Sequence, residues 1–69
     1  MFYAQVMAEE GEDLMTEEEV AKLLTVSVST VKRLRVSGEG PRSIRISKRV
    51  VRYRRQDVLD WMRQRAEES

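Results

Sequence analysis

The sequence predicts a small α+β domain of three short helices and one β-hairpin, and three patterns support this prediction. Apolar residues recur at helical spacing over about 17–24 and 28–37, with only a few residues between the two stretches. Residues 44–46 and 51–53 alternate apolar and charged side chains, as half-buried strands do. A last helical stretch covers about 56–66. The length of 69 residues allows one domain.

The first helix has a clear start signal. Thr16 is followed three residues later by Glu19, which predicts a capping box with Thr16 as the N-cap. The acidic residues of the first turn also suit the positive end of the helix dipole. The stripe that this helix buries consists of Val20, Ala21, Leu23 and Leu24.

A tight turn leads into the second helix. Ser27 is expected to cap this helix and Gly38 to end it in the left-handed conformation. Thr25 occupies a turn position where Gly is usual, so it must avoid or tolerate a positive φ at some cost. Ala21 is small enough for a close helix crossing, and Val26 is expected to fill the turn. With Val31 and Leu34 packing back on the first helix, the pattern is that of a helix-turn-helix.

The hairpin is expected to place Ile44, Ile46, Val51 and Tyr53 on the core face. Arg45 and Arg52 would then face outward, with Lys48 and Arg49 at the turn. A charged edge hairpin that merely stays soluble is one interpretation. A DNA-contacting wing is favoured, because so many charges of one sign repel each other unless a polyanion meets them.

The third helix carries an apolar face of Val58, Leu59, Trp61 and Met62. Trp61 is expected in the core rather than in a ligand site. We therefore predict a winged helix-turn-helix domain over residues 14–66, followed by a frayed tail at 67–69.

The charges are segregated along the chain. Between Lys32 and Arg55 there are ten cations and one anion, whereas the whole protein has a net charge of +1. The acidic residues gather in the first 19 residues and near the end of the chain. Such a basic block attracts a polyanion, most commonly the phosphate backbone of double-stranded DNA.

The composition argues against several other functions. The chain has no Cys and no His, so it lacks a thiol nucleophile, a disulfide and the usual ligands of zinc. It also lacks a glycine-rich phosphate loop, and we expect neither catalysis nor a cofactor. No apolar run is long enough to span a membrane, and the start lacks the basic region of a secretory signal, so a cytoplasmic location is expected.

Residues 1–13 begin with apolar residues and continue as an acidic segment. The apolar positions fit a helix and a strand equally well. One interpretation is a frayed terminus whose acids aid solubility or screen non-specific DNA binding. The other is an arm that packs on a neighbouring subunit, with acids complementary to that subunit's basic surface.

The candidate DNA contacts fall into two groups. The second helix is expected to read the major groove, with Arg33 as the foremost base-edge contact, because Arg pairs with guanine through two hydrogen bonds. Val28 would either touch a thymine methyl or pack at the helix start, and Ser27 would cap the helix, contact DNA or do both. The candidates on this helix are Ser27, Val28, Ser29, Thr30, Lys32, Arg33 and Val36. The candidates on the wing are Arg45, Lys48, Arg49, Arg52 and Arg54, with Lys48 and Arg49 in the minor groove and the others on phosphates. Arg35 is expected to reach solvent or the base of the wing.

The order of these motifs resembles MerR-like winged helices and, more closely, the phage excisionases. The resemblance lies in residues 14–24, 26–34, 40–42 and 45–62. It implies a recombination directionality factor that binds adjacent attachment-site sequences cooperatively and head to tail, bends the DNA and directs a tyrosine integrase towards excision in a bacterial host. A transcriptional regulator of a prophage or mobile element would use the same module. A third alternative is an adaptor whose basic face meets an acidic protein.

Overall fold

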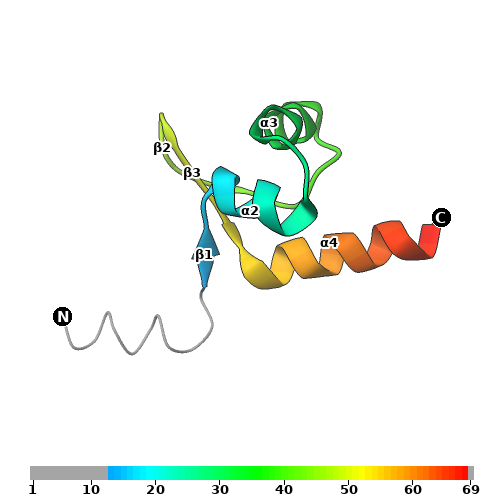
Figure 1. The fold of residues 1–69 in the computed structure, drawn as a ribbon. Coiled ribbons are helices and arrows are strands. Elements are labelled where there is room, and N and C mark those ends of the chain that lie inside the picture. Colours follow the sequence, from blue (N-terminus) through cyan, green and yellow to red (C-terminus); the bar gives the residue numbers. More distant parts are fainter. Residues whose placement is uncertain (1–12, 69) are drawn as a thin grey trace.

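The computed structural model describes residues 13–68, which form three helices and three strands (Figure 1). The arm expected over residues 1–13 therefore lies outside the described residues, apart from Asp13. In chain order the elements are β1 (Leu14–Met15), α2 (Glu17–Leu24), α3 (Val28–Ser37), β2 (Ile44–Ser47), β3 (Val50–Arg54) and α4 (Arg55–Glu68). This arrangement confirms the α+β fold class, a helix-turn-helix with a β wing and a C-terminal helix.

The helix ends follow the local sequence. The Thr16 hydroxyl accepts a hydrogen bond from the Glu19 backbone N–H at 3.1 Å, and Glu19 Oε1 accepts one from the Thr16 N–H at 2.8 Å. This confirms the predicted capping box. Ser27 caps α3 by accepting from the Thr30 N–H, and Gly38 ends α3 with φ of 80°.

The turn between α2 and α3 holds the one non-glycine residue with positive φ in the part of the chain that the structure describes. Thr25 has φ of 55° and ψ of 47°, so of the two alternatives it tolerates the left-handed conformation despite its Cβ. The expectation for Val26 was wrong, because its side chain is 40% exposed. Ala21 and Val31, both buried, already fill the space where α2 crosses α3.

The sheet has three antiparallel strands in the order β1-β3-β2. Strand β1 was not predicted, because two residues carry no periodic signal. It pairs Leu14 with Arg54 and Met15 with Tyr53, and this pairing helps to bury Met15 in the core. Strand β1 thus pairs with the edge of β3 that the hairpin leaves free, and it ties the chain before α2 to the base of the wing.

The predicted faces of the hairpin were wrong for β2. Residues directly opposite each other in an antiparallel pair lie on the same face, and Ile44 pairs with Arg52 while Arg45 pairs with Val51. The register then shifts between Arg45 and Ser47, which leaves Ile46 as the extra residue of a β-bulge. A slip of one residue exchanges the faces of a strand. Ile44 is therefore on the face opposite Val51, Ile46 is 56% exposed, and Arg45 shares the face of Val51.

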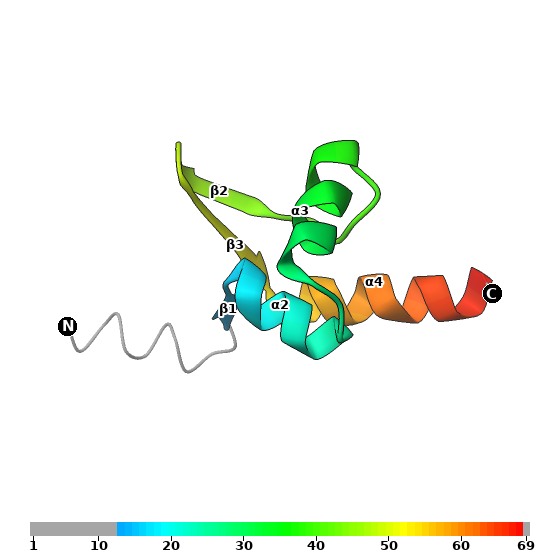
Figure 2. The same cartoon turned by 45° about the horizontal axis from the view of Figure 1, so that its top comes forward.

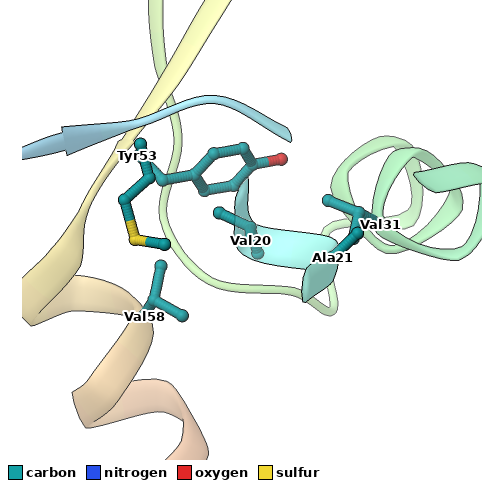
Figure 3. Packing of buried hydrophobic residues seen from close by; sticks show 6 residues of the cluster. Val20, Ala21, Val31, Tyr53 and Val58 are labelled. Carbon is teal, nitrogen blue, oxygen red and sulfur yellow. The ribbon is translucent and has the colours of Figure 1, made fainter. Parts of the chain in front are cut away.

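The core joins the sheet to α2, α3 and α4. Tyr53 is its largest fully buried residue, and Figure 3 shows its ring beside Val20 with the hydroxyl turned away from Val58. The buried residues of the hydrophobic core are Met15, Val20, Ala21, Val31, Tyr53 and Val58. Leu23, Leu24, Val28, Val51 and Met62 pack against them.

Trp61 was expected in the core, and this expectation was wrong. Its side chain is half-buried, and its indole Nε1 donates a hydrogen bond to the Glu39 carbonyl oxygen at 3.0 Å. The Arg65 guanidinium lies 5.0 Å from the centre of the Trp61 ring. Trp61 therefore fastens the loop after α3 to α4. At the same loop a Cβ on Gly40 would lie 2.9 Å from the Leu34 Cβ, so only glycine fits there without a shift.

Helix α4 starts directly after β3 and is longer than predicted. It includes Arg55 at its start and residues 67 and 68 at its end, where a frayed tail was expected. Within residues 13–68, no helix combines the length and the apolar character that crossing a membrane requires.

Candidate nucleic-acid interface

Helix α3 and the tip of the hairpin lie at the same end of the molecule, away from α4 (Figures 1 and 2). Val31 is the buried residue of α3, and Ser29, Lys32, Arg33 and Val36 are exposed. Val36 is 79% exposed, which agrees with its predicted outward position. An exposed helix face beside a projecting hairpin is the geometry with which winged helices meet a duplex.

The start of α3 is ordered by its own side chains. The Ser27 and Thr30 hydroxyls lie 2.9 Å apart, and Arg33 Nη2 lies 3.5 Å from the Thr30 oxygen. Val28 packs against the core, which favours the packing alternative over contact with a thymine methyl. Of the candidates on this helix, Ser27, Thr30 and Arg33 thus have local partners, and Ser29, Lys32, Arg33 and Val36 are exposed.

A groove runs between α3 and the hairpin, and α2 contributes its first residues to it. The groove brings together cations from separate elements and contains two carboxylates, Glu17 and Glu18. Its cations are Lys32, Arg35, Arg45, Lys48, Arg49 and Arg52. Four of the five wing candidates therefore converge with Lys32 of α3 on one cationic surface, as the charge segregation had suggested.

Arg54 lies apart from this groove. It pairs with Leu14 on the face of β3 opposite the buried Tyr53, and it does not line the groove. Arg52 alternates to the same face as Arg54, but its Nη1 donates to the Val51 carbonyl oxygen at 2.8 Å and its side chain lines the groove. On the opposite strand, Arg45 Nη1 donates to the Lys48 carbonyl oxygen at 3.1 Å and braces the turn.

One ion pair connects the three elements around the groove. Arg35 Nε of α3 donates to Glu17 Oε2 of α2 at 2.6 Å, and the Tyr53 hydroxyl of β3 donates to the same oxygen at 3.1 Å. The side chains of Arg35 and Glu17 are only 22% and 11% exposed. We call these three residues the Glu17 triad. The triad connects α3 and β3 through Glu17 of α2.

The triad also changes the acidity of its members. Burial, together with the negative charge of Glu17, raises the pKa of Tyr53 to about 12. The hydrogen bond to Glu17 raises the pKa of Arg35 above its ordinary value. Sequence reasoning missed the triad: Glu17 was assigned only to the helix dipole and Arg35 to solvent or the wing base. No local pattern joins residues on three different elements.

A second ion pair fixes the entry of the N-terminal segment. Arg55 Nε donates to Asp13 Oδ2 at 2.9 Å, and the Arg55 backbone N–H donates to the Asp13 carbonyl oxygen at 2.9 Å. The paired carboxylate and guanidinium are about half exposed, so this contact adds little stability by itself. It holds Asp13 beside the start of α4.

The cations that line this groove suit a polyanion. Arg and Lys side chains offer charge-assisted hydrogen bonds to phosphate oxygens. Among residues 13–68, no cluster of three acidic, His or Cys side chains is arranged to hold a metal ion.

A family model described as a helix-turn-helix domain matches residues 14–66, which is most of the chain. No curated protein matches the sequence.

Proposed function

We propose that this chain, which belongs to the helix-turn-helix family of DNA-binding domains, is a phage excisionase. In this role it binds adjacent sequences of attachment-site DNA, bends the DNA without catalysing any step, and directs a tyrosine integrase towards prophage excision in the bacterial cytoplasm. The observation that carries the proposal is the cationic groove between α3 and the hairpin. This groove supports a mode of binding in which α3 and the hairpin contact the same DNA duplex.

The exposed side of α3 is the proposed reader of the major groove. Arg33 is exposed and long enough to reach a guanine edge, and its position near Thr30 limits its rotamers. Lys32 lines the groove and is assigned to a phosphate. Ser29 and Val36 flank the reading surface, while Ser27 and Thr30 act first by ordering the helix start.

The wing is proposed to contact the neighbouring minor groove. Lys48 and Arg49 form the two-residue turn between β2 and β3 and are exposed. Arg45 and Arg52 would bind phosphates on the way to this tip. Arg54 lies on the other face of β3, so in this proposal it acts through its charge rather than through a contact in the groove.

A domain of this size offers few contacts, which favours cooperative assembly on DNA. We assign a head-to-tail contact to residues 1–12, whose acids Glu9, Glu10 and Glu12 complement a neighbour's basic surface. The Asp13–Arg55 pair supports this assignment because it fixes the place from which the segment leaves the domain. Removal of residues 1–12 should abolish cooperativity in gel shifts on multi-site DNA, and unchanged cooperativity would reject the assignment.

The function is tested first by whether an integrase gene and an attachment site lie beside this reading frame, and then with that DNA and that integrase. Circular-permutation gel shifts should reveal several adjacent sites and a strong bend, and the protein should stimulate excision by the integrase. A single unbent operator overlapping a promoter, with no effect on excision, would instead identify a transcriptional regulator. Binding to no DNA, or binding that is insensitive to salt, would favour the adaptor function.

A further inference from the structure

We propose that the Glu17 triad builds a phosphate-binding site in the groove, in which Arg35 receives a phosphodiester oxygen of the DNA strand between α3 and the hairpin. Glu17 and Tyr53 are the positioning residues that hold Arg35. This inference rests on DNA binding by the groove and is independent of the excision role. It assigns a function to Arg35, which sequence reasoning had left without one.

The first support is the way in which Arg35 is held. Glu17 engages only Nε of the guanidinium, and Arg35 still lines the groove. A guanidinium presents a planar fork of N–H donors, so the hydrogen bond at one corner leaves others for a phosphate oxygen. An arginine fixed in this way loses less side-chain freedom on binding than a mobile one.

The second support is the neighbourhood of Arg35. Lys32 precedes it by three residues and lies on the same side of α3, while Arg45 and Arg52 reach the groove from the two strands. Like charges brought so close together repel each other unless an anion lies between them. One phosphate in the groove would meet cations from the reading helix and from the wing at once.

The third support is the state of the two carboxylates. The Glu17 side chain is only 11% exposed, and both hydrogen bonds described above go to its Oε2. Its charge is therefore directed at Arg35 rather than at a ligand. Glu18 lines the same groove and is exposed, so it faces an incoming phosphate as a repulsive charge. The two neighbouring acids are thus predicted to have opposite effects on DNA binding.

The experiment measures DNA affinity over a range of salt concentrations for Arg35→Met and for the matched control Arg63→Met. Arg63 is an exposed residue of α4 that does not line the groove, and its substitution removes the same charge. Loss of one phosphate contact should lower the slope of log affinity against log salt by about 0.9. The ratio of the wild-type DNA affinity to that of Arg35→Met should therefore fall about 3.5-fold between 50 and 200 mM salt. A slope equal to that of the Arg63→Met control would overturn the proposal.

Three further variants keep the test decisive if Arg35→Met does not fold. Arg35→Lys preserves the charge but not the planar fork, so it should weaken binding with little change in slope. Equal affinity of Arg35→Lys and wild type would contradict the site. Glu18→Gln removes a negative charge that faces the DNA, so this variant should bind DNA more tightly. Glu17→Gln should instead weaken it, because Arg35 is released, and tightening by both variants alike would refute the positioning role.

The outcomes separate this site from the excision role. A wild-type protein that binds DNA without bending it or stimulating integrase would refute the excisionase proposal and leave the Arg35 site intact. An unchanged salt slope in Arg35→Met, with bending and stimulation preserved, would refute the Arg35 site alone.

Discussion

Tyr53 should make the fold sensitive to alkaline pH. Its side chain is 1% exposed, its hydroxyl donates to Glu17, and its pKa is raised from 10.0 to about 12. Between these two values the unfolded chain loses the phenolic proton while the folded chain keeps it. The free energy of unfolding therefore falls as pH rises through this window, and it is unaffected by this group below pH 10.

The size of the effect follows from the shift in pKa. Each unit corresponds to about 1.4 kcal/mol, so the full shift corresponds to a loss of up to about 3 kcal/mol by pH 12. A domain of 69 residues has a total stability of roughly 3–10 kcal/mol. Ionisation of this one phenol should therefore remove a large fraction of the stability.

The assay is urea unfolding followed by circular dichroism from pH 7 to pH 11.5, with Tyr53→Phe as the comparison. The variant should lose about 1–2 kcal/mol at neutral pH, because the hydrogen bond to a charged carboxylate is gone. Its stability should then decline less steeply above pH 10 than that of the wild type. All other ionisable side chains are common to both proteins, so the comparison isolates the phenol of Tyr53. An equally steep alkaline decline in Tyr53→Phe would refute the assignment to this phenol.

Four other substitutions test three separate features. Thr25→Gly should raise the free energy of unfolding by up to about 1 kcal/mol and the melting temperature by about 5 °C, because a left-handed φ no longer strains a Cβ; a lower melting temperature would contradict this. Trp61→Phe should cost about 1 kcal/mol in urea unfolding through loss of the hydrogen bond to the Glu39 carbonyl, whereas an unchanged midpoint would show that the loop needs no such tie. Arg33→Ala should weaken specific DNA by about 1–3 kcal/mol and random DNA far less, while Arg52→Ala should weaken both alike; equal losses for Arg33→Ala in a competition gel shift would exclude base reading.

The parts of the fold that sequence predicted well are those determined by neighbouring residues. The capping box at Thr16, the Ser27 cap and the left-handed Gly38 each depend on residues within about one helical turn. The fold class followed from these signals and from the alternation in the hairpin. Strand β1 and the bulge at Ile46 could not be predicted, because they depend on how one strand aligns with another.

In the candidate site too, sequence predicted the overall charge but not the contacts that depend on the tertiary fold. Charge segregation pointed to the cationic surface, and the groove brings most of the wing residues together. Alternation along β3 puts Arg52 and Arg54 on the same face, and sequence could not show that only the Arg52 side chain reaches the groove. It also could not place Trp61, which was expected in the core because of its size but holds a loop instead. Glu17, Arg35 and Tyr53 meet only through the tertiary fold.

The bulge in β2 also affects how copies of this protein can associate. Strand β2 forms one outer edge of the sheet, and an uninterrupted edge strand offers backbone groups to which any other extended chain can add. The extra residue at Ile46 breaks that regular row, and the flanking arginine and lysine side chains oppose the approach of a second cationic hairpin. The wing can therefore remain long and exposed without recruiting further strands, so polymerisation into a continuous sheet is disfavoured even when many copies are crowded along one DNA.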